Sequence, residues 1–585
     1  MSSNAMSIGF ELTDLKDNTK TYLSPINSIN PSLSKKSADQ NSVSFKKGNL
    51  KAKIQNMKPH LKGQYRSFFA KLVTYTSGFL ISSAYMDPGN YSVNVNTGAQ
   101  NQYALLTVIF LSSCIAVFLQ SLCIKLGSVT GMDLAKNCKK NCNKYINFIL
   151  WMFAQTAIIC TDIAEVIGTS IALNILLKIP LYGGVLLTSF DIMLVLIFFR
   201  PGGSNSLKIF KVYEFCVAIL VIGVAICFAI QLGYLPQGTS VRQIFKGFIP
   251  THALFENDGI LNSTSVLGAT VMPHSLYVGS SIVLYRLLKY DISKGNFDEN
   301  DLEVNQSHNT ADDVEVTVVD QIETGNGSCS NAVHPTATTK QTIETTASKD
   351  QANISENEVP PKLPKENEIS EFDIVNSMYT GYKPSIAAIN YCIKSSIIEL
   401  AVTLMTVALF VNCAIIIVAG ATLYGSAEAT GASIYTIHDL LSKSLSKTVG
   451  TVFIIALLLS GECAGMLCAH ASCVLDGHLN KQLSNVWQKR LATRGISIIP
   501  ALVVSLVVGK AGINKTLNVT QVILSVLLPF ITLPIFYFTS RSKYMTVVEN
   551  GVTKDYSNNW ITIFLCVIIW VFISTLNMYM IVESA

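Results

Sequence analysis

Charged residues are scarce in this sequence. They make up 14% of its 585 residues, whereas 50% are hydrophobic, and the mean hydropathy is +0.40. An ordinary soluble domain is excluded, because such domains carry about 25% charged residues. Nothing in the sequence resembles a soluble enzyme or a nucleic-acid-binding protein. The composition predicts a protein that crosses a lipid bilayer several times.

Two further features are missing. The N-terminal region contains no apolar run that resembles a cleaved signal peptide. Of the fourteen cysteines, only Cys138 and Cys142 are closely spaced, and their Lys-rich loop offers no further metal ligands. We therefore expect reduced cysteines with structural roles, and no resident cofactor.

Eleven apolar segments are long enough to cross a hydrocarbon core of about 30 Å. They lie near residues 67–97, 103–127, 146–177, 181–199, 212–234, 260–288, 391–423, 450–476, 495–509, 517–539 and 560–582. Lys and Arg are about twice as frequent in the loops after the even-numbered segments as in the loops after the odd-numbered ones. The positive-inside rule therefore places the N-terminus in the cytosol and the C-terminus on the other side.

Two polar segments accompany the membrane regions 67–290 and 376–585. Residues 1–66 are rich in Ser, Asn and Lys without apolar periodicity, which predicts a disordered cytosolic tail. Residues 291–375 are acidic and contain just two aromatic residues, which predicts a disordered cytosolic linker. We also expect the Lys-rich tail to offer a contact for a ubiquitin-ligase adaptor.

Helix-breaking polar motifs interrupt two of the apolar segments, DPGN at 87–90 in the first and MPH at 272–274 in the sixth. Proline lacks an amide hydrogen and clashes with the preceding turn, so each motif frees backbone carbonyls at mid-membrane depth. An aspartate in hydrocarbon costs about 2.5 to 3.5 kcal/mol, so Asp87 must face a cavity or a partner. Interrupted segments at matching positions of two halves are typical of a transporter's substrate site.

Seven motifs follow one another along the chain. They are AYMDPGNY (84–91), LQSLC (119–123), KLG (125–127), TGMDLA (130–135), TDIAEVIGT (161–169), GATVMPHSLY (268–277) and TQVILS (520–525). In this order they resemble the Nramp family of proton-coupled divalent metal transporters, its fungal members above all. The resemblance implies an all-α membrane protein of the LeuT-like, amino acid-polyamine-organocation fold. Helices 1–5 and 6–10 would form an inverted repeat in which helices 1 and 6 are broken. Helix 11 would follow the repeat as one extra helix.

The two interruptions predict a metal-ion site. Asp87 offers an anionic oxygen, and Asn90, three residues later, offers a neutral one. Met272 matches the family's thioether ligand, and a soft sulfur favours Mn²⁺, Fe²⁺, Co²⁺ or Cd²⁺ over Mg²⁺ and Ca²⁺. The resemblance adds the backbone carbonyls of Ala84 and Ala269 and the amide of Gln521. Instead of binding metal, the Gln521 amide could form a hydrogen bond to a neighbouring helix.

Asp162 and Glu165 are three residues apart, so they share one face of the third segment. Two carboxylates in hydrocarbon indicate a proton relay. The alternative is a structural salt bridge with a cation from another helix, because their own span contains neither Lys nor Arg. His274 titrates near neutral pH when unperturbed, and its place near Met272 indicates proton coupling. The alternative is a core histidine.

Three positions depart from the family pattern. Gly279 stands where many relatives have a second histidine, Gln155 replaces a glutamate, and Glu462 replaces a glutamine. The last two exchanges would compensate each other if helices 3 and 8 are neighbours, with one carboxylate facing Arg494. Neutral drift is the alternative.

The sequence predicts a symporter that carries divalent metal ions and protons toward the cytosol. Manganese is the first expected substrate and iron the second, with cobalt and cadmium as further ones. Two alternatives stay open, a sodium-coupled organic-solute symporter of the same fold and a non-transporting metal sensor. The protein is expected in the plasma membrane or in an endosomal or vacuolar membrane, with its N-terminus in the cytosol.

Overall fold

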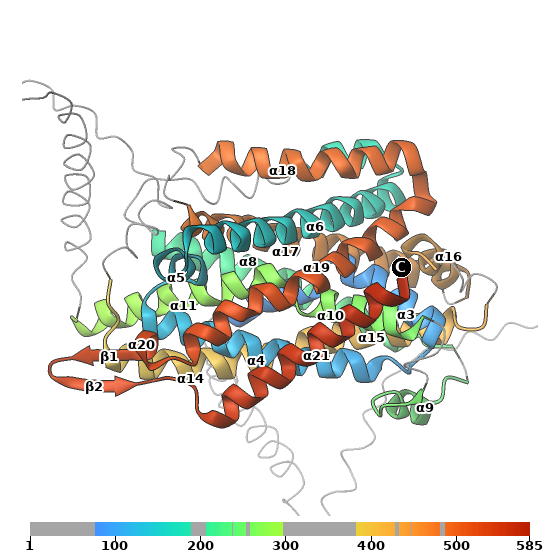
Figure 1. Cartoon of the computed structure of the whole chain (residues 1–585). Coiled ribbons are helices and arrows are strands. Elements are labelled where there is room, and N and C mark those ends of the chain that lie inside the picture. The colour runs from blue at the N-terminus through green and yellow to red at the C-terminus, as the bar shows by residue number, and fades with distance from the viewer. Residues whose placement is uncertain are drawn as a thin grey trace, which may run out of the picture. The chain divides into compact units, whose positions relative to one another are not determined.

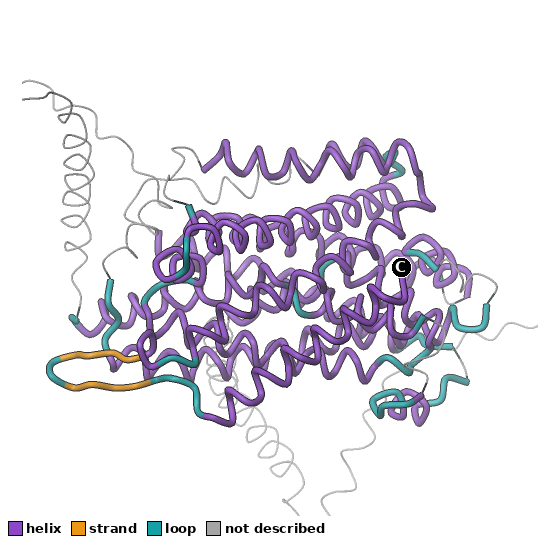
Figure 2. Tube along the Cα trace, viewed as in Figure 1, coloured by secondary structure: helices purple, strands orange, loops and turns teal. Residues whose placement is uncertain are grey.

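The computed structural model describes residues 76–188, 206–236, 238–252, 258–296, 382–426, 432–444, 446–479 and 486–584. The predicted tail with its adaptor contact, and most of the predicted linker, lie outside these residues. The described chain is almost entirely helical, and its long helices pack side by side (Figures 1 and 2).

Most helices of the first half overlap the predicted segments, whereas the short helices α5 and α9 lie outside them. They are α2 (Thr76–Ser83), η2 (Ala84–Met86), α3 (Pro88–Asn101), α4 (Leu106–Thr130), α5 (Leu134–Asn141), α6 (Lys144–Leu177), α8 (Ser206–Leu232), α9 (Val241–Lys246), α10 (Gly259–Thr270) and α11 (Pro273–Lys294). Helix α11 extends past the predicted boundary at residue 290. The reason is that Asp291 is buried and its carboxylate accepts hydrogen bonds from the hydroxyls of Tyr382 and Ser385.

The second half contains more helices and one hairpin. Its elements are α14 (Ile386–Thr403), the π-turn η5 (Leu404–Ala408), α15 (Leu409–Thr422), α16 (Ile434–Ser444), α17 (Lys447–Leu475), η6 (Asp476–His478), α18 (Val486–Val503), the π-turn η7 (Val504–Val508), α19 (Gly509–Thr539), α20 (Ser542–Met545), β1 (Thr546–Glu549), β2 (Val552–Asp555) and α21 (Trp560–Ser584). The strands β1 and β2 pair antiparallel, with Thr546 opposite Asp555.

Eight helices of the described chain are long and apolar enough to cross a membrane. The first predicted span is divided into α2 and α3, and the fourth is described only as far as residue 188. The ninth contains a shorter apolar helix, Arg494–Val507. The total of eleven spans therefore stays a prediction.

The two interrupted spans lie antiparallel to each other. We call Ala84–Asp87, between α2 and α3, the first break, and Val271–Met272, between α10 and α11, the second break. Helix α3 contacts α10, and α2 contacts α11, so the second half of one span lies beside the first half of the other. This is the arrangement that an inverted repeat predicts.

Glycines let neighbouring helices approach the interrupted spans closely. A Cβ atom at Gly168 of α6 would lie 2.1 Å from Cβ of Pro88, and one at Gly127 of α4 would lie 2.1 Å from the carbonyl oxygen of Ser280. Any larger side chain at these positions would push the helices apart, because such contacts are far inside van der Waals distance. The close approach therefore holds α3 against α6 and α11 against α4.

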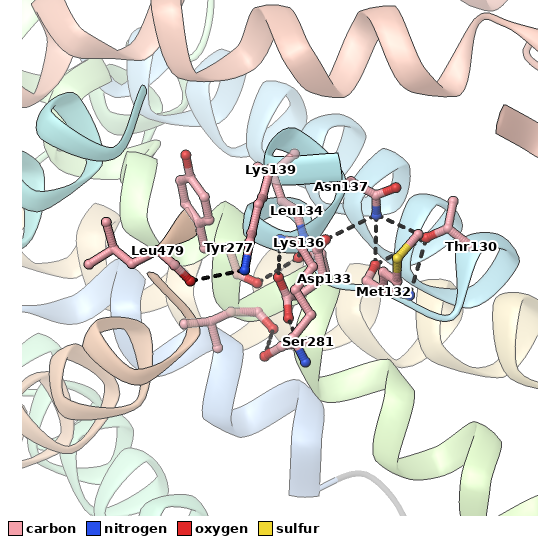
Figure 3. Close-up of polar contacts among 12 residues, drawn as sticks. Thr130, Met132, Asp133, Leu134, Lys136, Asn137, Lys139, Tyr277, Ser281 and Leu479 are labelled. Atoms are coloured by element: carbon pink, nitrogen blue, oxygen red, sulfur yellow. Dashed lines mark hydrogen bonds and ion pairs between the residues drawn. The ribbon is translucent and has the colours of Figure 1, made fainter. Parts of the chain in front are cut away.

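Polar contacts attach α5 to the neighbouring helices (Figure 3). The Asp133 carboxylate caps α5 by accepting a hydrogen bond from the Lys136 amide at 2.8 Å. Asn137 Nδ2 donates to Thr130 Oγ1 at 3.0 Å, which fixes α5 to the end of α4. Lys139 Nζ donates to the carbonyl oxygen of Leu479 at 3.0 Å, so α5 is also attached to the segment after α17.

Candidate metal-ion site

Asp87 stands at the first break, where it caps α3. Its carboxylate accepts hydrogen bonds from the amides of Gly89 at 3.1 Å and Asn90 at 3.0 Å, and from Asn90 Nδ2 at 2.6 Å. Pro88 occupies the first helical position, where its missing N–H costs nothing. The DPGN motif thus folds as a helix N-terminus that holds one buried carboxylate beside one buried amide.

Each break leaves a carbonyl without its usual helical partner. The amide nitrogen four residues after Ala84 belongs to Pro88, and the one four residues after Ala269 belongs to Pro273. Proline has no N–H to donate, so neither alanine carbonyl can form the ordinary α-helical hydrogen bond. These are the two carbonyls that the family resemblance implies as metal ligands.

Other carbonyls of the first break are bonded by side chains from neighbouring helices. Asn412 Nδ2 of α15 donates to the Tyr85 carbonyl at 2.8 Å, and Ser460 Oγ of α17 donates to the Met86 carbonyl. These contacts stabilise the unwound backbone, because a buried carbonyl without a donor is costly.

Gln120 of α4 joins the two breaks, a contact that the sequence reasoning missed. Its Nε2 atom donates to Tyr85 Oη at 3.1 Å and to Ser275 Oγ at 2.9 Å, and Ser275 Oγ donates to the Met272 carbonyl at 2.7 Å. A Cβ atom at Gly279 would lie 1.9 Å from Gln120 Oε1. The absence of a histidine at position 279 therefore matches the space that Gln120 occupies.

Helix α19 places Gln521 against both interrupted spans. A Cβ atom at Gly89 would lie 1.8 Å from Gln521 Nε2, and one at Gly268 would lie 2.2 Å from the Gln521 carbonyl oxygen. Both polar atoms of the Gln521 side chain, and Asn90 Oδ1, are buried without a hydrogen-bond partner in the described chain. An unpaired buried polar atom costs about 1–3 kcal/mol, so these three atoms indicate a place for a ligand.

The six predicted metal-binding residues are all buried. Asp87, Asn90, Met272, Ala84, Ala269 and Gln521 are each at most 1% exposed. An ion can reach a site that is closed on this scale only if helices move, as alternating access requires. The binding of a metal by these residues stays a prediction.

The structure supplies a cation for the carboxylates of the third predicted span. Arg494 of α18 donates through Nη2 to Glu165 Oε1 at 2.8 Å and through Nη1 to Glu165 Oε2 at 3.1 Å. The same Nη1 lies 3.5 Å from Asp162 Oδ1, and Ser497 Oγ donates to Asp162 Oδ2 at 3.2 Å. The buried salt bridge is therefore present in this structure, and the proton relay stays a prediction.

His274 connects the second break to these carboxylates. Its Nδ1 atom lies 3.4 Å from Thr161 Oγ1, and its Nε2 atom lies 3.9 Å from Cys468 Sγ. The Cys468 sulfur lies within 4.8 Å of carboxylate oxygens of both Asp162 and Glu165. Sequence reasoning missed Thr161 and Cys468, since hydroxyl and thiol groups are common in apolar helices and carry no signal of their own.

Helices α6 and α17 are neighbours, as the compensation between Gln155 and Glu462 requires. The carboxylates found against Arg494 are, however, those of Glu165 and Asp162. The compensation hypothesis stays untested.

Two antiparallel interrupted spans with unpaired polar atoms at their junction are typical of a membrane transporter. The sequence matches the family described as Nramp, natural resistance-associated macrophage protein-like, over residues 78–314 and 379–583. The chain therefore belongs to the Nramp family.

Curated relatives and a solved structure agree with this assignment. The chain is 42% identical over 560 residues to the manganese transporter SMF1 of Saccharomyces cerevisiae, covering 88% of this chain and 86% of the relative. It is 38% identical over 541 residues to the iron transporter SMF3 of the same organism, covering 88% and 96%. A crystal structure of the Eremococcus coleocola manganese transporter shares the fold, with a TM-score of 0.62 at 24% identity, covering 88% and 87%.

Proposed function

We propose that this protein is a proton-coupled symporter that carries divalent transition-metal ions into the cytosol. The observation that carries the proposal is the set of three unpaired polar atoms, on Asn90 and Gln521, beside the buried Asp87. A metal ion between the two breaks would give a partner to the two amide oxygens, Asn90 Oδ1 and Gln521 Oε1, and would balance the charge of Asp87. The Gln521 Nε2 donor would instead need an acceptor, such as a water molecule bound to the ion. Membrane potential favours inward movement by about 2.3 kcal/mol per elementary charge per 100 mV.

Manganese is the first proposed substrate, iron the second, and cobalt and cadmium are further ones. Met272 is fully buried where α11 begins, and a thioether favours these ions over the hard ions Mg²⁺ and Ca²⁺. The names of the relatives, two of them manganese and iron transporters, support this choice. The distribution of Lys and Arg supports a cytosolic N-terminus. The plasma membrane or an endosomal or vacuolar membrane is the proposed location.

We propose that protons leave the second break by the path that starts at His274. From there Thr161 and Cys468 lead to Asp162, and Arg494 joins Asp162 to Glu165. Because the path is separate from the proposed metal ligands, neutral variants along it should separate the two fluxes.

The test uses proteoliposomes with a membrane potential. We compare the wild type with the double variant Asp162→Asn/Glu165→Gln and with a triple variant that also carries Arg494→Gln. The triple variant leaves no buried cation unpaired. Both variants should lose metal-stimulated acidification of the lumen while they retain Mn²⁺ uptake, and Thr156→Val on the exposed part of α6 serves as the control. Proton flux at the wild-type ratio to metal would overturn the proposed path, and loss of Mn²⁺ binding alone would show that these carboxylates serve the metal.

A further inference from the structure

A cavity of about 810 Å³ is lined by residues of α5, the end of α11, the segment before α14 and the β1–β2 hairpin. Figure 1 shows these elements near one end of the helix bundle. The volume suits a ligand headgroup of moderate size, since ligand pockets measure about 300–1,000 Å³. None of the proposed metal ligands or relay residues lines it. The cavity is therefore a second, separate site on the described chain.

Hydrogen bonds fix the walls of this cavity. The Asp291 carboxylate accepts from Tyr382 Oη at 2.6 Å and from Ser385 Oγ at 2.5 Å, which joins the end of α11 to the start of α14. The Glu549 carboxylate accepts from the amide of Ile386 at 2.6 Å, which joins the hairpin to α14. Both acidic groups in the wall are thus already engaged by donors of the protein.

The basic groups of the cavity are in the opposite situation. Lys140 of α5, Lys383 before α14 and Lys543 of α20 line it, and all three are exposed. None of them forms an ion pair with another residue of the described ranges, and Lys543 Nζ lies 5.4 Å from the ring centroid of Tyr544. Three lysines from three elements line one cavity without an ion-pair partner among the described residues, and such a basic wall favours an anionic ligand.

Aromatic and cationic side chains around the hairpin place this cavity at the membrane surface. Arg541 lies 4.8 Å from the ring centroid of Tyr537, just past the end of the α19 span, and Lys554 lies 4.9 Å from that of Tyr556. Tyrosines with basic neighbours at helix ends mark the level of lipid headgroups. On the proposed orientation, this is the cytosolic surface.

We propose that the cavity binds the phosphorylated headgroup of an anionic lipid of the cytosolic leaflet, with a phosphoinositide as the chemical class. The phosphates would pair with Lys140, Lys383 and Lys543. Basic pockets at the cytosolic ends of transmembrane helices suit such headgroups.

The experiment measures binding of a fluorescent short-chain phosphatidylinositol bisphosphate to the full-length protein in detergent. The test variant is Lys140→Gln/Lys383→Gln/Lys543→Gln. Its matched control is Lys443→Gln/Lys447→Gln/Lys515→Gln, which removes the same charge from exposed positions outside the cavity wall. Each lysine contributes about 1 kcal/mol near an anionic headgroup, so the test variant should bind about a hundredfold more weakly, and the control within about twofold of the wild type.

Three outcomes would overturn the proposal. Binding that falls equally in both triple variants would show attraction by net charge alone, and free inositol trisphosphate that binds as tightly as the lipid would identify a soluble ligand. No binding to the wild type would mean that lipid does not enter the cavity, as when the acidic segment between α11 and α14 fills it. Mn²⁺ binding, measured in the same samples, distinguishes these outcomes from failure of the metal site.

Discussion

Two buried polar clusters of this protein lie on neighbouring helices. They differ in whether their polar groups have partners within the protein. At the breaks, Asn90 Oδ1 and both polar atoms of Gln521 have no partner among the described residues. On α6, the Glu165 carboxylate pairs with Arg494 through two hydrogen bonds. We propose a metal ion as the partner of the first cluster, whereas in the second the carboxylates pair with the guanidinium group of Arg494. On our proposal, the first cluster binds the transported ion, and the second, which contains the salt bridge, belongs to the proton path.

The largest effect is expected from Asp87→Ala, which removes the anionic group of the unpaired cluster. Mn²⁺ binding to the purified protein should weaken by about a hundredfold or more, and uptake should be lost, because the remaining ligands are neutral. Calorimetric titration with Mn²⁺ checks this. Asn96→Ala is the control, since Asn96 lies on the same helix but donates to Asn262, at 3.1 Å. Binding by Asp87→Ala at wild-type strength would place the metal elsewhere.

Substitutions in the second cluster, Asp162, Glu165 and Arg494, should change the free energy of unfolding rather than the affinity for metal. Arg494→Met leaves two buried carboxylates without their cation and should lower the free energy of unfolding by about 3–5 kcal/mol. Adding Asp162→Asn and Glu165→Gln to Arg494→Met should restore most of that loss. Thermal unfolding of the three proteins measures both effects. Equal stability of Arg494→Met and the wild type would show that the network does not hold α18 to α6.

A smaller effect of opposite sign is expected when polar groups are removed from the two clusters, by Gln521→Leu in the first and Ser497→Ala in the second. Gln521→Leu replaces two unpaired polar atoms with apolar ones, so the metal-free protein should become slightly more stable while Mn²⁺ binding weakens by about tenfold. Ser497→Ala, which removes a donor to Asp162, should instead lower stability and leave Mn²⁺ binding unchanged. Thermal unfolding with and without Mn²⁺ checks both variants. A loss of stability in metal-free Gln521→Leu would mean that Gln521 already has a partner.

The breaks could be predicted from sequence because their cause is local. Pro88 and Pro273 remove hydrogen bonds within their own helices, so the unwound carbonyls follow from the residue order alone. The family resemblance extended this to Gln521, and the structure places that residue against both interrupted spans. The long apolar segments alone predicted a multi-span membrane protein, whereas the LeuT-like inverted repeat was predicted from the family resemblance.

The ion-pair partners of the buried carboxylates could not be predicted from local sequence patterns. Glu165 and Arg494 are 329 residues apart, and their contact depends on how α6 and α18 pack. The bridge that Gln120 forms between the breaks has the same origin. The hairpin, in contrast, had a signal that was missed. Asn550 and Gly551 both have positive φ angles, as the Asn-Gly turn of a two-residue hairpin requires.

A transition-metal ion that binds between the two breaks, as we propose, should have Met272 as its sulfur ligand. X-ray absorption spectroscopy of Cd²⁺ bound to the purified protein tests it most directly, because sulfur and oxygen neighbours scatter differently. The wild type should show one sulfur neighbour among oxygen neighbours, and Met272→Ala should show oxygen neighbours alone with weaker binding. An oxygen-only shell in the wild type, or a sulfur neighbour that persists in Met272→Ala, would contradict the account.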